Sequence, residues 1–309
     1  MTKRILTLTP LLLLWYPRLH GQTIDDGIMM GKRLLCAGYM YTNDSWNEYW
    51  EGKLKRTSGN IGTLTTQSHQ LFANYGVTNR LNVIAHIPHV RTEASDGVLA
   101  GQRGWQDATM AVKYKFLDTP ITEVGSFRAI AVVSAATPMT NYTPDFLPVS
   151  IGLGSRRAAA RVTGHFRARK GWFLNATSAY TWRDGVKLDR PYFYTNGRLT
   201  FSDRVQMPSV FDYALSSGYI RRDLVLSASF SRQRTQGGGD IRRQDMPFVS
   251  NRMNFSRAGV WAKVPLPRHE DISLVAGYSY VLNGRNVGQS SAFTIGVMYL
   301  FRFPGSPTK

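Results

Sequence analysis

The chain has 309 residues, of which 43% are hydrophobic, 12% aromatic and 19% charged, a composition that argues against a disordered protein. The mean hydropathy of -0.25 argues against a bundle of transmembrane helices, and the single cysteine, Cys36, excludes an internal disulfide. The net charge of +18 favours contact with lipid phosphates or an anionic solute. No nucleic-acid-binding motif accompanies that charge, so nucleic acid is not an expected partner.

The N-terminus predicts export. Lys3 and Arg4 precede the apolar stretch ILTLTPLLLLWYP, and the small residue Gly21 follows at a suitable distance for cleavage. The apolar run from Ile5 to Trp15 is too short to span a bilayer comfortably. We therefore expect residues 1–21 to be a secretory signal peptide and residues 22–309 to form a single domain in a bacterium with two membranes.

The rest of the chain alternates between apolar and polar residues over long stretches. In residues 108–116 the even positions are Ala, Met, Val, Tyr and Phe, while the odd positions include Thr109, Lys113 and Lys115. A period of two gives a strand with one apolar and one polar face. These stretches are about twice as long as the 5–6 residues typical of soluble sandwiches and match tilted membrane strands.

Two tryptophans support a membrane barrel. Trp172 and Trp182 are ten residues apart and therefore point to the same face of one strand. Ten residues at ~3.4 Å, tilted by ~45°, rise about 24 Å, close to the ~25 Å apolar band between two aromatic girdles. We expect these two residues to mark the two membrane interfaces.

Thirteen stretches qualify as strands by this pattern. They are residues 33–41, 62–76, 79–87, 105–117, 125–137, 156–169, 171–183, 192–203, 210–221, 223–234, 252–264, 270–282 and 292–303. Barrels of this kind have even numbers of strands, with short turns at one end and long loops at the other. Both rules are satisfied if 192–203, which contains Asn196-Gly197, is a short hairpin inside an external loop at 184–209.

The resulting prediction is an all-β, transmembrane, antiparallel up-and-down barrel of about twelve strands. Splitting 192–203 into two full strands would give the alternative of fourteen. Long external loops are expected at 42–61, 88–104, 138–155 and 235–251 as well, with both termini in the periplasm.

The stretch from Phe293 to Phe303 is predicted to be the last strand. Its apolar odd positions would face lipid, while Thr294, Gly296 and Arg302 would point inward. Met298 and Leu300 are apolar but also inward, which indicates a packed lumen near them. The candidate girdle aromatics are Trp172, Trp182, Tyr299, Phe301 and Phe303.

Basic side chains are predicted on the inner wall. The candidate lumen-lining residues are Lys113, Lys115, Arg161, His165 and Arg167. They could favour anions in a pore, or they could lie at the rims beside lipid phosphates, and the pattern does not decide between the two. The lumen could also be plugged by its own side chains or by residues 22–32.

The sequence predicts no enzyme, cofactor or metal site. His86 and His89 are the nearest approach to a metal pair, but their odd spacing places them on opposite faces of a strand. No nucleophile elbow or triad spacing is present, so a lipid hydrolase is disfavoured. The glycines at 237–239 lack the lysine and helix of a phosphate-binding loop.

Three stretches carry a family resemblance. YGVTNRLNVIAHIPHVRTEA (Tyr75–Ala94) and GWQDATMAVKYKF (Gly104–Phe116) resemble the first hairpin and following strand of the outer-membrane family associated with the MetA pathway of phenol degradation. Residues 146–167 are similar to the later loop and returning strand of that family. The resemblance implies an outer-membrane barrel that transports small compounds, and it transfers no binding residue.

The function expected from these observations is a passive outer-membrane channel for a small hydrophobic or anionic solute. The alternative is a structural or assembly barrel that binds a partner through loops such as 42–61, where Trp46, Tyr49 and Trp50 suit a contact surface. The expected surroundings are outer-membrane lipid, lipopolysaccharide and the barrel-assembly machinery.

Overall fold

The computed structural model describes residues 23–121, 123–195, 197–242 and 248–306. The predicted signal peptide, residues 1–21, lies outside this part of the chain. No helix among the described residues is long and apolar enough to cross a membrane.

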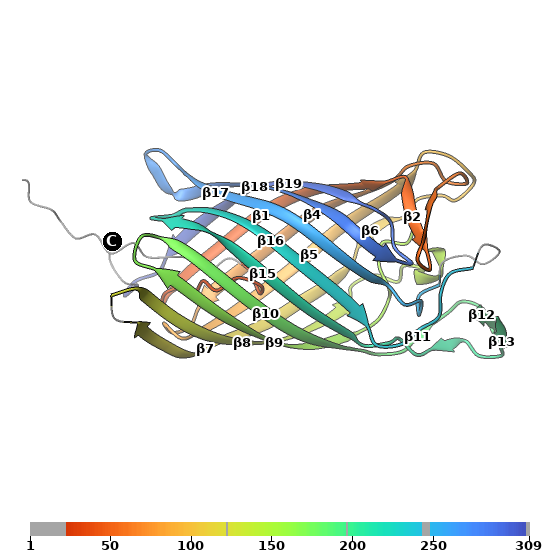
Figure 1. The fold of residues 1–309 in the computed structure, drawn as a ribbon, viewed down its shortest axis with the longest axis horizontal. Helices are drawn as coiled ribbons and strands as arrows, with labels where there is room; N and C mark the ends of the chain where they lie inside the picture. Colours follow the sequence, from red (N-terminus) through yellow and green to blue (C-terminus); the bar gives the residue numbers. More distant parts are fainter. Residues whose placement is uncertain (1–22, 122, 196, 243–247, 307–309) are drawn as a thin grey trace, which may run out of the picture.

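Twelve long antiparallel strands close into a barrel (Figure 1). Each strand pairs with its neighbours in the chain, and β1 pairs with β19 from Leu34↔Arg302 to Ser45↔Ser291. The strands are β1 (Leu34–Trp46), β4 (Leu64–Gly76), β5 (Leu81–Ala94), β7 (Asp107–Ile121), β8 (Gly125–Pro138), β9 (Arg157–Ala168), β10 (Trp172–Arg183), β15 (Val210–Arg221), β16 (Leu224–Thr235), β17 (Asn254–Leu266), β18 (His269–Arg285) and β19 (Ser291–Arg302). The prediction of a twelve-stranded barrel is confirmed.

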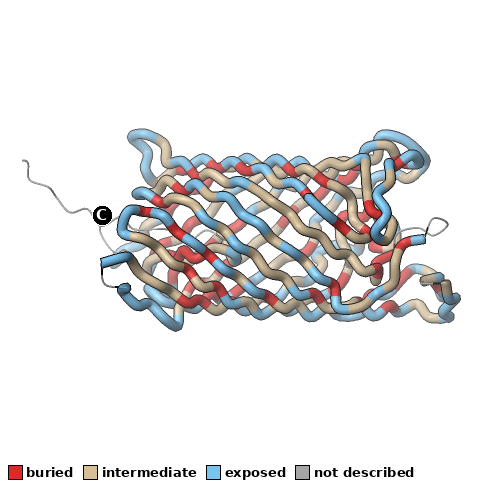
Figure 2. The backbone as a smooth tube through the Cα atoms, viewed as in Figure 1, coloured by how far each residue is buried: buried red, intermediate tan, exposed pale blue. Residues whose placement is uncertain are grey.

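The two faces of the wall have opposite chemistry. On β7 the outward positions Met110, Val112 and Tyr114 are exposed, while Ala111 and Lys113 between them are buried. Figure 2 shows this alternation of buried and exposed residues along the strands. An apolar outer surface of this extent is stable only in contact with lipid. The fold is that of an outer-membrane β-barrel.

The two ends of the barrel differ in the length of their connections. Short turns, such as residues 222–223 between β15 and β16, lie at the end where β1 begins and β19 ends. The long connections gather at the other end, on the right of Figure 1. In barrels of this type the short turns are periplasmic and the long loops external.

Two strand ends differ from the prediction by five residues or more. The strand expected at 33–41 continues to Trp46, and the one expected at 79–87 continues to Ala94, so the loops at 42–61 and 88–104 are shorter than expected. Both extensions pair with β4, the first as far as Trp46↔Leu64 and the second as far as Leu64↔Ala94. Backbone hydrogen bonds between the strands do not depend on apolar side chains, so the pairing continues where the outward residues have become polar. The sequence pattern of alternating apolar residues ends earlier.

The external end also holds short strands. β2 (Glu48–Glu51) and β3 (Leu54–Thr57) form a hairpin between β1 and β4. β6 (Arg103–Trp105) pairs with β5 beyond a break at Gln106, and β7 then continues the pairing from Thr109. A 3-10 turn, η1 (Pro144–Phe146), lies in the loop between β8 and β9.

The segment 192–203 is a hairpin outside the barrel wall. β12 (Phe193–Thr195) pairs only with β13 (Arg198–Thr200), and at its base β11 (Val186–Lys187) pairs with β14 (Arg204–Val205). Gly197 has a φ of +78°, the left-handed conformation that a tight turn requires. The fourteen-strand alternative is therefore wrong.

The external loops pack against one another. Phe193 stacks on Phe248 with ring centroids 5.2 Å apart, and the Arg190 guanidinium lies over the Phe248 ring, 5.7 Å from its centroid. Arg190 also pairs with Asp145 at 2.7 Å. Arg285 and Asn286 donate hydrogen bonds to the Asp240 carboxylate and thereby lower its pKa.

The aromatic residues of the first loop also point inward. Trp50 is buried against Gly284, and the Trp46 ring lies against Gly288. Their side chains join the first loop to the connection between β18 and β19. Trp50 is buried and Trp46 and Tyr49 are half-buried, so these rings fill space between loops. Binding of a partner through this loop stays a prediction.

Candidate functional site in the barrel lumen

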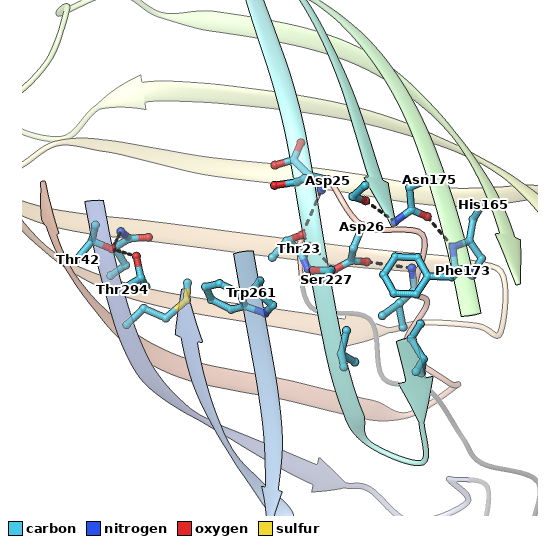
Figure 3. A pocket seen from close by; sticks show the side chains of 17 residues that line it. Thr23, Asp25, Asp26, Thr42, His165, Phe173, Asn175, Ser227, Trp261 and Thr294 are labelled. Atoms are coloured by element: carbon cyan, nitrogen blue, oxygen red, sulfur yellow. Dashed lines mark hydrogen bonds between the residues drawn. The ribbon is translucent and has the colours of Figure 1, made fainter. Parts of the chain in front are cut away.

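A segment that precedes the first strand lies inside the barrel. Residues 23–31, called the plug segment here, run within the lumen and are not part of the sheet, and Figure 3 shows Thr23, Asp25 and Asp26 among side chains of the inner wall. The segment then turns into β1, where the Arg33 amide donates to the Gly76 carbonyl at 2.7 Å. The lumen is thus filled at this level by the chain itself.

Three consecutive apolar residues bind the plug segment to the wall. Ile28 packs with Phe173, Ile220 and Val225, which lie on β10, β15 and β16. Met29 packs in a cluster that lies on β5, β7 and β8, made of Ile84, Ala111, Ile130 and Val132. Met30 is fully buried in a third cluster, made of Leu34, Cys36, Phe72, Val275, Met298 and Leu300. The three side chains therefore contact nearly the whole circumference.

Two carboxylates bind the plug segment to basic residues of the wall. The Lys113 ammonium lies 2.8 Å from Asp26 Oδ1 and also donates to the Thr23 carbonyl at 2.9 Å. The Arg161 guanidinium lies 3.0 Å from Asp25 Oδ1. The Lys113 side chain is 0% exposed, so Asp26 provides the charge partner that a buried ammonium requires.

A glycine allows the closest approach of the plug segment to the wall. A Cβ atom at Gly27 would fall 2.4 Å from the His165 ring, so a larger residue has no room there. The His165 ring is fully buried, and its Nδ1 lies 2.6 Å from Asn175 Oδ1. Its Nε2 has no hydrogen-bond partner among the described residues.

A cavity of about 370 Å³ lies beside the plug segment (Figure 3). One part of its lining is apolar and includes Met40, Phe173 and Trp261. The other part carries small hydroxyl and amide groups, which belong to Thr42, Gln70, Asn175, Ser216, Ser227, Ser229 and Thr294. The volume falls in the ~300–1,000 Å³ range of small-molecule sites.

The five basic residues predicted for the lumen fall into two groups. Lys113, Arg161 and His165 contact the plug segment, as described above. Lys115 pairs with Asp118, and Arg167 is a half-buried residue on β9 near the short-turn end. Sequence reasoning missed the partners of the first group, Asp25 and Asp26. The signal that could have found them is a pair of adjacent acids at the start of an otherwise basic domain.

The five candidate girdle aromatics lie on the outer face. Trp172 and Trp182 are 61% and 51% exposed and occupy the two ends of β10. Tyr299 and Phe301 are exposed neighbours on β19, with ring centroids 4.5 Å apart, and Phe303 follows them. Their role at the membrane interfaces remains a prediction.

The histidine pair is divided between the two faces. His86 hydrogen-bonds Gln70 on the inside, at 3.1 Å, whereas His89 packs against Trp105 on the outside. Among the described residues, no group of three His, Cys, Asp or Glu side chains could hold a metal ion.

Comparisons with known proteins concern the fold. No protein-family model and no curated protein matches the chain. Among solved structures, an outer membrane channel from Pseudomonas putida F1 superposes with a TM-score of 0.71 and 15% identity, covering 90% of this chain and 100% of that one.

Other solved barrels superpose less well. The translocator domain of the autotransporter NalP from Neisseria meningitidis has a TM-score of 0.44 and 12% identity, covering 88% of this chain and 89% of its own. The NanC porin has a TM-score of 0.45 and 12% identity, covering 84% and 98%. The similarity to the P. putida channel shows that 90% of this chain shares one barrel fold with it.

Proposed function

We propose that this protein is a passive channel of the outer membrane that is closed at rest by its plug segment. The observation that carries the proposal is the kind of structure that blocks the lumen. The lumen is filled by a segment that is not paired into the sheet, rather than by side chains of the wall alone. Such a segment can leave without breaking any strand-to-strand hydrogen bond.

The chemistry of the inner wall supports a polar solute. Hydroxyl and amide groups line the cavity, and cationic groups hold the plug segment. A polar, partly charged wall lowers the barrier for solutes that keep part of their hydration. We therefore favour a small polar or anionic solute over a hydrophobic one.

Three further assignments complete the proposal. We assign residues 1–21 as the signal peptide. The hairpin motif between Tyr75 and Ala94 supports membership of the MetA-pathway family. We also assign outer-membrane lipid, lipopolysaccharide and the barrel-assembly machinery as the surroundings of the barrel.

A reversible cross-link tests the proposal. A Cβ atom at Gly27 would lie 2.5 Å from His165 Cβ, so a shift of about 1 Å brings two cysteines there to the ~3.8 Å of a disulfide. Gly27→Cys and His165→Cys are combined with Cys36→Ala, and the protein is reconstituted in planar bilayers. We expect transient channel openings under reducing conditions, when the plug segment is free to leave, and their loss on oxidation, because the disulfide fixes the plug segment.

The two single-cysteine variants serve as controls, and neither should respond to oxidant. Liposome swelling with small uncharged sugars gives a second readout. A folded barrel that passes neither ions nor sugars in its reduced state would contradict the channel proposal. Folding is checked independently by the faster gel migration of the unheated barrel.

A further inference from the structure

The two cations that hold the plug segment lie in one row of the wall. Lys113 on β7 is opposite Val132 on β8, and Val132 is opposite Arg161 on β9. With ~4.8 Å between neighbouring strands, the Cα atoms of Lys113 and Arg161 are about 10 Å apart. Both side chains are directed into the lumen, where each meets a carboxylate of the plug segment.

Carboxylates that belong to the barrel wall are not the direct partners of these cations. Asp107 accepts from Arg157 at 2.9 Å. Asp212 on β15 is close enough to Arg161 for their charges to interact, but the two side chains form no ion pair. In the described part of the chain, no wall carboxylate forms an ion pair with Lys113 or Arg161. The plug segment supplies the ion-pair partner of both.

If the plug segment moves, Lys113 and Arg161 both lose their ion-pair partners. Lys113 then faces the lumen without its carboxylate partner, and a replacement anion can take the place of Asp26. Arg161 presents a planar guanidinium suited to a carboxylate. The geometry of the site is that of two carboxylates on one short segment, because Asp25 and Asp26 are adjacent.

We propose that Lys113 and Arg161 form a binding site for small organic dicarboxylates, occupied in the closed state by the carboxylates of Asp26 and Asp25. Solute and plug segment compete for the same two cations. The cavity beside the plug segment is lined by Asp25 and Asp26 themselves, so a solute in it lies next to the carboxylates that it displaces. This inference rests on the proposed function and specifies its solute class.

Competition between solute and plug segment is measured first, by a method that does not depend on conductance. Hydrogen exchange of backbone amides in residues 23–31 is followed in the detergent-solubilised protein while succinate, glutarate or adipate is added. We expect each dicarboxylate to speed exchange in this segment, and Lys113→Gln with Arg161→Gln to weaken its apparent affinity at least about tenfold, since each cation supplies a charged hydrogen bond. Lys115→Gln is the matched control, because Lys115 pairs with Asp118 instead.

Selectivity is measured second, in planar bilayers. Asp25→Asn with Asp26→Asn removes both plug carboxylates and should open the channel with a reversal potential shifted toward chloride. Dicarboxylates should block this current, and Lys113→Gln with Arg161→Gln should relieve the block. 1,4-Butanediol, which has a similar size but no charge, should neither block the current nor speed exchange.

The outcomes separate the two proposals. A conducting barrel in which dicarboxylates act no differently from the diol, or act equally without Lys113 and Arg161, overturns the dicarboxylate site and leaves the channel standing. Succinate-dependent exchange that requires Lys113, in a barrel that never conducts, supports the site and contradicts the channel.

Discussion

Lys113 is the residue on which closure of the lumen depends most directly. Its ammonium is fully buried, and its partners Asp26 and Thr23 both belong to the plug segment. Asp26→Asn would leave a buried charge without its counter-ion, which costs about 3–5 kcal/mol in protein interiors. We expect this variant to raise the open probability of single channels about a hundredfold or more.

The double variant Asp26→Asn, Lys113→Met separates charge from packing. Without the ammonium no uncompensated charge remains, so docking of the plug segment should recover most of its stability. Open probability and exchange of residues 23–31 are compared for both variants. Equal opening in the single and double variants would show that the ion pair is not what holds the segment.

Among the elements, β19 has the largest structural task, because it closes the barrel onto β1. Removing residues 301–309 deletes the register pairs Leu34↔Arg302 and Leu35↔Phe301 together with the exposed Phe301 and Phe303 rings. We expect the truncated protein to fail to insert in the outer membrane, as measured by membrane fractionation and gel migration without heating.

Removal of residues 304–309 alone is the matched control for that truncation. These residues follow β19, and their deletion removes the 2.7 Å hydrogen bond that the Arg33 guanidinium donates to the Pro304 carbonyl but leaves every register pair of β19 in place. The shorter truncation should therefore assemble normally. Normal assembly of the longer truncation as well would show that the terminal aromatic strand is dispensable.

The alternation of apolar and polar residues predicted the parts of the strands that face lipid. The alternation in β7 and β19 indicated both strands and their faces, because every second side chain must be apolar in the membrane. The inward Met298 and Leu300 correctly indicated a packed lumen, yet the residue that packs there, Met30, lies outside any strand. The ends of β1 and β5 were missed because polar residues continue the ladder there without an apolar signal.

At the scale of the whole molecule, the barrel wall is closed by twelve strands. The hairpin of β12 and β13 pairs with no barrel strand, so its tip should be dispensable for assembly. We expect replacement of residues 194–199 by two glycines to leave membrane insertion and unheated gel migration unchanged. Loss of the compact form would show that the hairpin contributes to barrel closure.

The lumen illustrates what the sequence could not provide. The basic residues of the inner wall were predicted from strand alternation, which is a local pattern. Their partners Asp25 and Asp26 lie far away in the chain, in a segment without periodicity, and only the folded barrel brings residue 26 to residue 113. The same basic residues that suggested an anion pathway therefore hold an acidic segment at rest.

Met30 is buried among side chains from both sides of the join between β1 and β19. The cluster that buries Met30 is complete only after β19 has paired with β1. A half-assembled barrel thus lacks one of the three clusters that hold the plug segment, whereas a finished barrel has all three. Biogenesis would deliver each new copy already shut, so that adding this protein to the outer membrane does not breach the permeability barrier of the cell.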